Sequence, residues 1–565
     1  MALGLVALVV TLFALLPPAA AQLQAAAPAL SVLNGSYFVA ARKVAARPAA
    51  DIPPALQSAI AAINGSAWLH TPEAHVHDTK RTGNETQLDV YIGPFSVMNK
   101  SITPASGDKH DFICISAYYW PCNARCGVDA PAPKGASCET FCKPPVPNPG
   151  VLPGPDGSCL YRANPPAAPG KTHASCPDSW CNNGSEIVSR NGIPTTGDCS
   201  CTACNMSSGL PWATHNGFDW PGAEIDRGAI DGVWENVIPL VLGWWYTAPP
   251  TDSGVAGVPA GAVSTVYFSR AAHILRVWFL DEQTKMNPNL NFADTYPGTG
   301  VGVGGTVNAA RVHIALDMIL LMEVGDAEQQ IWTARDRAGM RAWIREFLVW
   351  WRTSPPGKGA HGILQNIGTS WSLNAISMAL YIGDSAQATE IATEDLRWRV
   401  SLAVNAKGQV WRELDHNAGS YSYVIGHLKE LLDIATLGDR TGLGRTVDLW
   451  NYRANSSVGS IKMALEWMAP FCSHNCTGMT IQQKINCSGW PRFSIDDLPM
   501  NECKMIYRIA GLHYRNASWA RIAEEQSDDR PYVWWVAGMG RVKGIPMSDL
   551  MTLTYPALAP LATRV

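Results

Sequence analysis

Polar and aromatic residues that could bind a sugar are concentrated in a few short segments. The clearest is Gly107-Asp-Lys109-His110-Asp111, followed closely by Tyr118-Tyr119-Trp120-Pro121. A cation, an imidazole and three aromatic rings therefore lie together in one predicted loop, and aromatic faces offer stacking surfaces for sugar rings. Similar segments follow at Trp234-Glu235-Asn236, Trp244-Trp245-Tyr246, Met286 to Asn291, Gln365 to Thr369, and His416 with Tyr421 and Tyr423. These residue types point to polysaccharide recognition.

The 22 tryptophans also allow a purely structural interpretation, because buried tryptophans dominate many cores. Trp278, Trp343 and Trp350 fall in apolar helical stripes, so we expect them in the core. Trp120 is flanked by proline and polar residues, which favours a place in the wall of a groove.

Two other motifs suggest chemistry that their context does not support. Gly300-Val-Gly302-Val-Gly304-Gly305 has the letters of a dinucleotide fingerprint, but it follows a predicted loop instead of a buried strand. Cys201 and Cys204 have the spacing of zinc or redox pairs, but no paired histidines accompany them. We therefore expect no cofactor and no metal.

After about residue 210, apolar residues recur with helical spacing, which predicts helices. The polar segments lie between these predicted helices, so the helices must position them. Trp343, Phe347, Trp350 and Trp351 form one apolar stripe, and Leu428, Leu431, Leu432 and Ala435 form another. Similar stripes run through Leu316, Ile319 and Leu320, and through Ile376, Ala379 and Leu380. Breaks at Gly325-Asp326, Gly383-Asp384 and Gly438-Asp439 recur about every 55 residues. This pattern predicts an all-α fold, an incomplete α/α toroid of antiparallel helix pairs.

The rest of the chain divides by composition. Residues 1–21 have the apolar run and small residues of a signal peptide, and residues 22–85 are an Ala/Pro-rich lead-in with one helix near Leu56 to Ile63. Residues 86–550 are the predicted toroid, interrupted at residues 122–210 by a Pro/Gly/Cys-rich insertion, and residues 551–565 are a tail. The insertion lacks the apolar residues for a core of its own, so we expect disulfides to hold it.

Cysteines and glycosylation sequons agree with a secreted protein. Eleven of the 15 cysteines lie between Cys114 and Cys204, and ten Asn-x-Ser/Thr sequons are spread along the chain. The odd count leaves one thiol over, for which Cys114 is the candidate because it lies in an apolar run. The prediction is a secreted, extracellular, disulfide-bonded glycoprotein with no membrane association after signal cleavage.

The charges exclude one class of partner. The net charge is -4, and neither sign collects in long runs, so the chain has no electrostatic footprint for nucleic acid. An acidic polysaccharide would need a local basic or hydrogen-bonding groove instead.

Several motifs, in order along the chain, resemble the alginate lyase domain family. They are Ser106 to Phe112, Ala117 to Pro121, Trp278-Phe-Leu-Asp281 with Met286 to Asn291, Gly383-Asp384, and Val447 to Asn451, over roughly residues 86 to 535. The resemblance implies an α/α toroid that cleaves uronate polysaccharides, of the alginate or glucuronan type, by β-elimination. It also implies a substrate-binding set of Lys109, His110, Tyr119, Trp120, Asn289, Asn291, Gln365 and Trp371.

The resemblance implies the catalytic positions as well. The Asn-Asn-His motif of the family falls on Gln365-Asn366-Ile367, which keeps Asn366 but not the histidine. The tyrosine of the family falls on Tyr423. His416 or Asn417 stands where the family has an arginine, so His416 is the candidate donor to the substrate carboxylate.

The two replaced residues leave three hypotheses open. In the first, Tyr423 is both base and acid, assisted by Asn366 and His416. In the second, the chain is a catalytically inactive homologue that binds an extracellular acidic polysaccharide, with Ile367 making the groove apolar. In the third, the protein is purely structural and is joined to others through its cysteine-rich insertion.

Overall fold

The computed structural model describes the helical body of the chain and parts of the connecting segments. The described residues are 29–65, 95–100, 104, 106–115, 119–121, 181–182, 186–188, 194–195, 212–214, 225–247, 262–295, 312–326, 330–414, 420–472, 490, 502–525 and 553–554. The predicted signal segment 1–21, most of the insertion 122–210 and the tail 551–565, apart from two residues, lie outside these ranges.

The predicted all-α fold is confirmed, since helices dominate the described chain and build an incomplete α/α toroid. Its main helices are α7 (Ile225–Thr247), α8 (Ala262–Leu275), α9 (Val312–Gly325), α10 (Ala334–Thr353), α11 (Pro355–His361), α12 (Asn366–Tyr381), α13 (Ser385–Ala403), α14 (Trp411–Leu414), α15 (Ser420–Arg440), α16 (Ile461–Cys472), α18 (Glu502–Tyr514) and α19 (Ala517–Glu525). A π-helical turn, η5 (Arg276–Leu280), extends α8. Short 3₁₀ turns are η3 (Val97–Asn99) and η7 (Leu443–Arg445).

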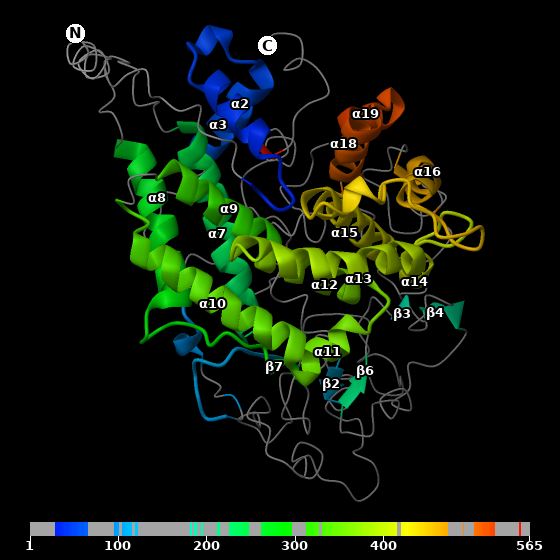
Figure 1. The fold of residues 1–565 in the computed structure, drawn as a ribbon, viewed down its shortest axis with the longest axis horizontal. Coiled ribbons are helices and arrows are strands. Elements are labelled where there is room, and N and C mark those ends of the chain that lie inside the picture. Colours follow the sequence, from blue (N-terminus) through cyan, green and yellow to red (C-terminus); the bar gives the residue numbers. More distant parts are fainter. Residues whose placement is uncertain are drawn as a thin grey trace, which may run out of the picture.

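Helix α12 is the centre of this arrangement. It packs against α9, α10, α13 and α15, and Figure 1 shows it between α10 and α13. Nearly all its residues are buried, and a helix buried on every side has no solvent face to reserve for charges. The small polar residues among them bond locally, as Asn374 does to the Ser370 carbonyl at 2.9 Å. Its position is therefore fixed by neighbours on all sides.

The predicted helical stripes are confirmed. On α10, Trp343, Phe347 and Trp351 are buried, while Trp350 is partly buried and packs against the same core. The breaks at Gly325 and Gly383 also end helices, and Gly383 has the left-handed φ of +82° that suits glycine. The predicted break at Gly438-Asp439 lies one to two residues before the end of α15 at Arg440, and the left-handed residue after this helix is Gly442. Gly438 itself is helical, and a Cβ there would meet the Leu449 side chain.

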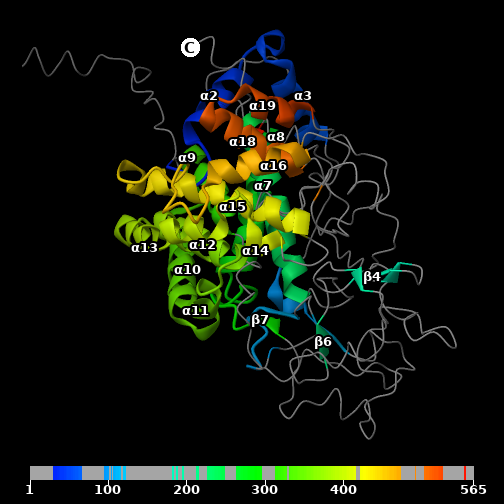
Figure 2. The ribbon, with the colours of Figure 1, turned by 90° about the vertical axis from the view of Figure 1, so that its right-hand side faces the viewer.

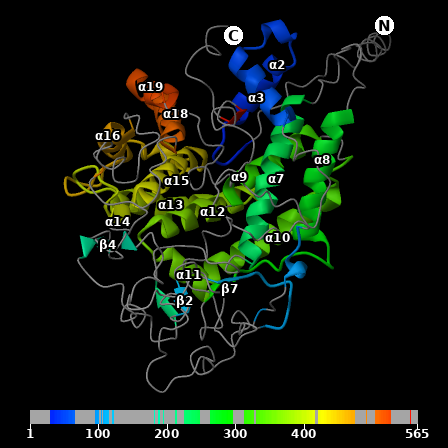
Figure 3. The same cartoon turned by 180° about the vertical axis from the view of Figure 1, so that it is seen from behind.

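The N-terminal segment belongs to the helical body, although the sequence indicated only one helix there. The predicted helix is α3 (Pro54–Gly65), and a second, α2 (Gly35–Ala45), precedes it, with a 3₁₀ turn, η2 (Ala49–Asp51), between them. The Trp245 indole of α7 donates to the Phe38 carbonyl of α2 at 3.0 Å. Figure 3 shows α2 and α3 at one end of α7. An Ala-rich lead-in can therefore complete the core.

A buried carboxylate attaches this N-terminal segment to α9. Asp317 is 0% exposed, and it accepts hydrogen bonds from the backbone N–H groups of Ser31 (2.6 Å), Val32 (3.0 Å) and Leu33 (3.0 Å). Burial raises the pKa of the Asp317 carboxyl from 3.8 to about 6, although these hydrogen bonds oppose the change.

This raised pKa predicts a specific pH dependence of stability. Between about pH 4 and pH 6 the folded chain binds the Asp317 proton more tightly than the unfolded chain, so this group's contribution to stability declines as the pH rises. A pKa difference of about 2 corresponds to about 3 kcal/mol as an upper limit. We expect the free energy of unfolding of the wild type, measured relative to Asp317→Asn, to fall by up to that amount from about pH 4 to about pH 7. Chemical denaturation at several pH values measures it, and a difference that does not vary with pH would contradict it.

Short strands connect the loop motifs. Strand β1 (Ile113–Ile115) pairs in parallel with β7 (Phe292–Thr295), and β2 (Tyr119–Pro121) pairs antiparallel with β6 (Trp212–Thr214). Within the predicted insertion, β3 (Cys181–Asn182), β4 (Glu186–Val188) and β5 (Pro194–Thr195) form a small antiparallel sheet. The β1–β7 pair brings the two polar loop motifs of the sequence together.

One ion pair fixes β1 to the start of α7. Lys100 Nζ lies 2.6 Å from Asp226 Oδ2, with both side chains buried, and the same oxygen accepts from the Ile113 N–H at 2.8 Å. Burial raises the pKa of Asp226 to about 6 and lowers that of Lys100, in each case against the effect of the partner charge. This pair holds the beginning of the polar loop in place.

The cysteines that the structure describes agree in part with the sequence analysis. Cys472 and Cys503 form a disulfide between α16 and α18. Cys114 is a fully buried thiol, as predicted, and its Sγ accepts from the Asp294 N–H at 3.2 Å. Among the described helices, none combines the length and apolarity needed to cross a bilayer.

Candidate active site

The two polar loop motifs form one hydrogen-bonded unit beside β1 and β7. Asp111 Oδ1 accepts from Asn287 Nδ2 at 2.9 Å and from Asn289 Nδ2 at 3.0 Å. His110 Nδ1 lies 2.6 Å from the Lys285 carbonyl. Segments about 175 residues apart in sequence are thus joined through side chains, and His110 braces the loop.

The structure describes the side chain of Lys109 in this predicted binding loop, but not those of Tyr119 and Trp120. Lys109 Nζ donates to the Lys100 carbonyl at 3.0 Å, so its charge lies over the start of the loop. Tyr119 and Trp120 are in β2, paired with Thr214 and Ala213, and their side chains lie outside the described part of the structure. Their predicted contact with sugar stays a prediction.

Asn291 connects the loop unit to the helical core. Its Oδ1 accepts from the Trp350 indole at 2.7 Å, and the neighbouring Trp343 indole donates to the Met286 carbonyl at 2.8 Å. Both tryptophans are on α10, which packs against α12. These two hydrogen bonds therefore fix the position of the Met286–Asn291 loop on α10, next to α12.

The N-terminus of α12 carries the predicted residues Gln365 and Asn366. Gln365 occupies the N-cap position without a side-chain cap, and its Nε2 donates to the Arg412 carbonyl at 3.4 Å. Asn366 is only 2% exposed, and its N–H donates to Glu413 Oε1 at 2.6 Å. The Asn366 side-chain amide makes no hydrogen bond to the described residues. The two N–H groups on its Nδ2 are therefore available as donors at the N-terminus of α12, an end of a helix where anions are favoured.

Helices α12 and α15 pack parallel to each other. Asn366 and Tyr423, which lie in the first turns of these two helices, are therefore at the same end of the helical body. Thr369 of α12 contacts His427 of α15 at 2.8 Å, and further along His313 lies 3.1 Å from Asn374 of α12 and 3.9 Å from Asp433 of α15. Asn366 is one turn before Thr369, and Tyr423 is one turn before His427, each on the same helix face as its partner. Tyr423 is partly exposed. A phenol and an amide are therefore brought to one end of two parallel helices.

Trp371 does not fit its predicted role. It is 5% exposed, its indole donates to the Trp351 carbonyl at 3.3 Å, and the Trp351 indole donates back to the Trp371 carbonyl at 3.2 Å. The His361 ring packs on it at 4.3 Å. This geometry makes Trp371 a core residue instead of a sugar-binding one.

Two histidines that the sequence singled out have different outcomes. His416 lies outside the described residues, so its predicted contact with the substrate carboxylate stays a prediction. The glycines at positions 357, 359 and 362 suggested an exposed loop around His361, but residues 355–361 form α11. His361 Nε2 lies 2.9 Å from Asp395 Oδ1, and Ser372 donates to the other oxygen of Asp395 at 2.6 Å. It therefore contributes to holding α11, α12 and α13 together.

Sequence reasoning assigned no role to Glu413 and His427, which are buried next to Asn366 and Thr369. It also missed Arg412, whose guanidinium stacks over the Trp411 ring at 4.3 Å. Trp411 is 37% exposed, one of few large apolar residues exposed in the described chain. The available signal was that Glu413 is the first residue of the segment, residues 413–423, that was aligned with the family's arginine motif. Figure 2 shows α14, which carries Trp411, Arg412 and Glu413, beside α15.

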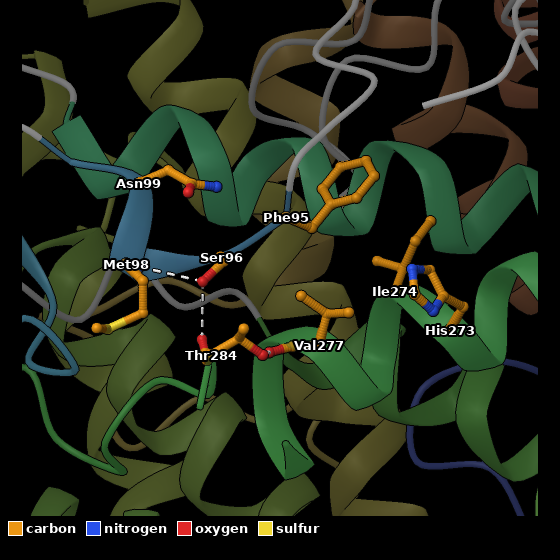
Figure 4. A pocket seen from close by; sticks show the side chains of 8 residues that line it. All are labelled: Phe95, Ser96, Met98, Asn99, His273, Ile274, Val277 and Thr284. Carbon is orange, nitrogen blue, oxygen red and sulfur yellow. Dashed lines mark hydrogen bonds between the residues drawn. The ribbon is translucent and has the colours of Figure 1, made fainter. Parts of the chain in front are cut away.

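A separate cavity of about 270 Å³ lies between the 95–99 segment and the α8–η5 helix (Figure 4). Its lining residues are Phe95, Ser96, Met98, Asn99, His273, Ile274, Val277 and Thr284. The Ser96 hydroxyl donates to the Thr284 carbonyl at 3.0 Å, which ties its two walls together. It contains none of the predicted site residues. No group of three or more metal-ligating side chains occurs among the residues that the structure describes.

Comparison with known proteins finds a family model that matches part of the chain. Residues 261–476 match the model of the alginate lyase family, a range that includes Asn289, Asn366 and Tyr423. The crystal structure of an alginate lyase from Bacteroides ovatus superimposes with a TM-score of 0.58 at 19% sequence identity, covering 92% of this chain and 99% of that one. At this identity the likeness shows the fold. Among curated proteins, none matched the sequence.

Proposed function

We propose that this protein is a polysaccharide lyase that cleaves a uronate polymer, of the alginate or glucuronan type, by β-elimination at the α12–α15 end of the toroid. The observation that carries the proposal is the side-chain amide of Asn366, which is nearly buried and unused by the described residues, at the same end of the parallel helices as Tyr423. The alginate lyase family match over residues 261–476 supports the same reaction class.

The chemistry assigns a separate task to each group. The proton on C5 of a uronate is too weakly acidic to leave until donors neutralise the adjacent carboxylate and stabilise the enolate-like intermediate. The Asn366 side-chain amide, which makes no hydrogen bond to the described residues, supplies that stabilisation. Tyr423, as phenolate, takes the C5 proton, and the resulting phenol returns a proton to the leaving O4. The C4–O4 bond breaks as the C4–C5 double bond forms, so atoms and electrons balance.

The test uses the purified full chain with alginate, with glucuronan and with a neutral polymer such as cellulose. The double bond in the product is conjugated to the carboxylate and absorbs in the ultraviolet. We expect absorbance to grow with at least one uronan and not with the neutral polymer. No growth with any uronan, over a range of pH, would refute the lyase.

A second candidate function is binding without cleavage, and one observation favours it. Ile367 stands where the family has a histidine, and it is partly buried against the core. It therefore supplies no donor or base beside Asn366. Retention of the protein on immobilised uronan, without any ultraviolet product, would support this candidate.

Secretion and glycosylation remain part of the proposal, and the exposed sequon at Asn455 offers a sharp test. Its Oδ1 accepts from the Ser457 N–H at 2.9 Å, an arrangement that leaves Nδ2 for a glycan. We expect chain expressed with residues 1–21 in a eukaryotic secretory host to appear in the medium and to lose one glycan mass in Asn455→Gln. Asn451→Gln, an exposed asparagine nearby that is not in a sequon, is the control. An unchanged glycan mass in Asn455→Gln would contradict occupancy at this site.

A further inference from the structure

The N-terminus of α12 is capped by a residue from another helix. The first N–H groups of a helix have no partner within it, and a side chain at the N-cap usually accepts from one of them. Gln365, at the N-cap of α12, makes no such bond. The carboxylate of Glu413, from α14, accepts from the Asn366 N–H at 2.6 Å instead. Glu413 is 0% exposed.

Behind this carboxylate, His427 joins α15 to the same unit. His427 Nδ1 lies 3.1 Å from Glu413 Oε1, without the alignment of a hydrogen bond, and its Nε2 shares a hydrogen bond with the Thr369 hydroxyl at 2.8 Å. His427 is also 0% exposed. A buried carboxylate is costly unless neighbouring groups compensate its charge. The N-terminus of α12 provides that compensation through the Asn366 N–H, and the His427 ring packs beside the carboxylate.

We infer that Glu413 and His427 are positioning residues that hold the first turn of α12, and with it the Asn366 amide, in register with Tyr423. The inference rests on the proposed function. It goes further because neither residue reaches the substrate, and both act through the backbone N–H of Asn366 and the hydroxyl of Thr369. A misplacement of about 1 Å at a reacting centre can lower a rate by about 100-fold, so loss of this cap affects turnover more than polymer affinity.

The test combines structural and kinetic measurements on the full chain. Glu413→Ala removes the acceptor, whereas Glu413→Gln keeps a carbonyl acceptor and removes the charge. We expect Glu413→Ala to lower kcat about 100-fold and Glu413→Gln about 10-fold, with KM changed less than about 2-fold. We also expect faster hydrogen–deuterium exchange in Glu413→Ala in the peptide that covers residues 361–370.

A matched control separates positioning from general destabilisation. Asp317 is another fully buried carboxylate that accepts backbone N–H groups of a distant segment, so Asp317→Asn loses stability without a selective fall in kcat. Unchanged exchange at residues 361–370 in Glu413→Ala overturns the inference, whether or not the wild type is active. Altered exchange with an unchanged kcat in an active enzyme also overturns it. A wild type without activity refutes the proposed function, and the exchange result then decides the positioning role.

Discussion

Tyr423→Phe is expected to abolish formation of the unsaturated product while leaving the fold and polymer binding intact. The phenol is the proposed base and acid, and proton transfer by one positioned side chain contributes about 10²-fold to 10⁴-fold to a rate. Removal of the hydroxyl should therefore lower kcat by at least about 100-fold. The measurement is the initial rate of ultraviolet absorbance on the uronan that the wild type cleaves, with affinity for the same polymer measured separately.

The chain offers a matched control two residues away. Tyr421 is on the same helix, is 0% exposed, and its hydroxyl lies 3.0 Å from Cys503 Sγ at the α16–α18 disulfide. Tyr421→Phe removes the same atom from the core, so it should lower thermal stability and leave kcat within about 2-fold of the wild type. If Tyr423→Phe retained more than a tenth of the wild-type rate, another group would have to be the base.

Gly368→Ala is expected to have the second large effect, because there is no room for a side chain at this position. A Cβ on Gly368 would lie 1.8 Å from the Ile363 carbonyl oxygen and 2.4 Å from Arg399 Nη1. Arg399 is buried and donates to the carbonyls of Ile363 (2.9 Å) and His361 (2.7 Å), so the turn before α12 cannot yield easily. Overpacking in a well-packed core costs about 1–3 kcal/mol and occasionally more. We expect the upper end of this range or beyond, with loss of activity.

Gly359→Ala is the control for this substitution. Gly359 is in α11, and a Cβ there would have nothing within 4 Å. Alanine favours the helix over glycine by about 1 kcal/mol, so this variant should be neutral or slightly more stable. Thermal unfolding of the two variants beside the wild type measures the difference. Equal melting temperatures for Gly368→Ala and the wild type would show that the turn can move.

Much of the fold was predictable, because it depends on patterns that repeat along the sequence. Apolar stripes such as Trp343, Phe347 and Trp351 specify which helix face is buried, and that information is local. The α2 helix was missed although Tyr37, Phe38, Ala41 and Val44 recur with helical spacing. Its place in the core depends on contacts with α7 about 200 residues later. The helix end predicted at Gly438-Asp439 falls one to two residues before the observed end at Arg440.

The candidate site divides in the same way. The polar loop motifs were visible in the sequence by itself. The alignment of Asn366 and Tyr423 with catalytic positions, and of Ile367 with a histidine, is what the family resemblance implies. Only the tertiary structure decided that Trp371 belongs to the core and that α12 and α15 run in the same direction, which brings Asn366 and Tyr423 to one end. It also decided that Glu413 caps a helix that begins 47 residues before it. Residue type and spacing are properties of the chain, whereas burial and capping between helices depend on which distant segments pack together.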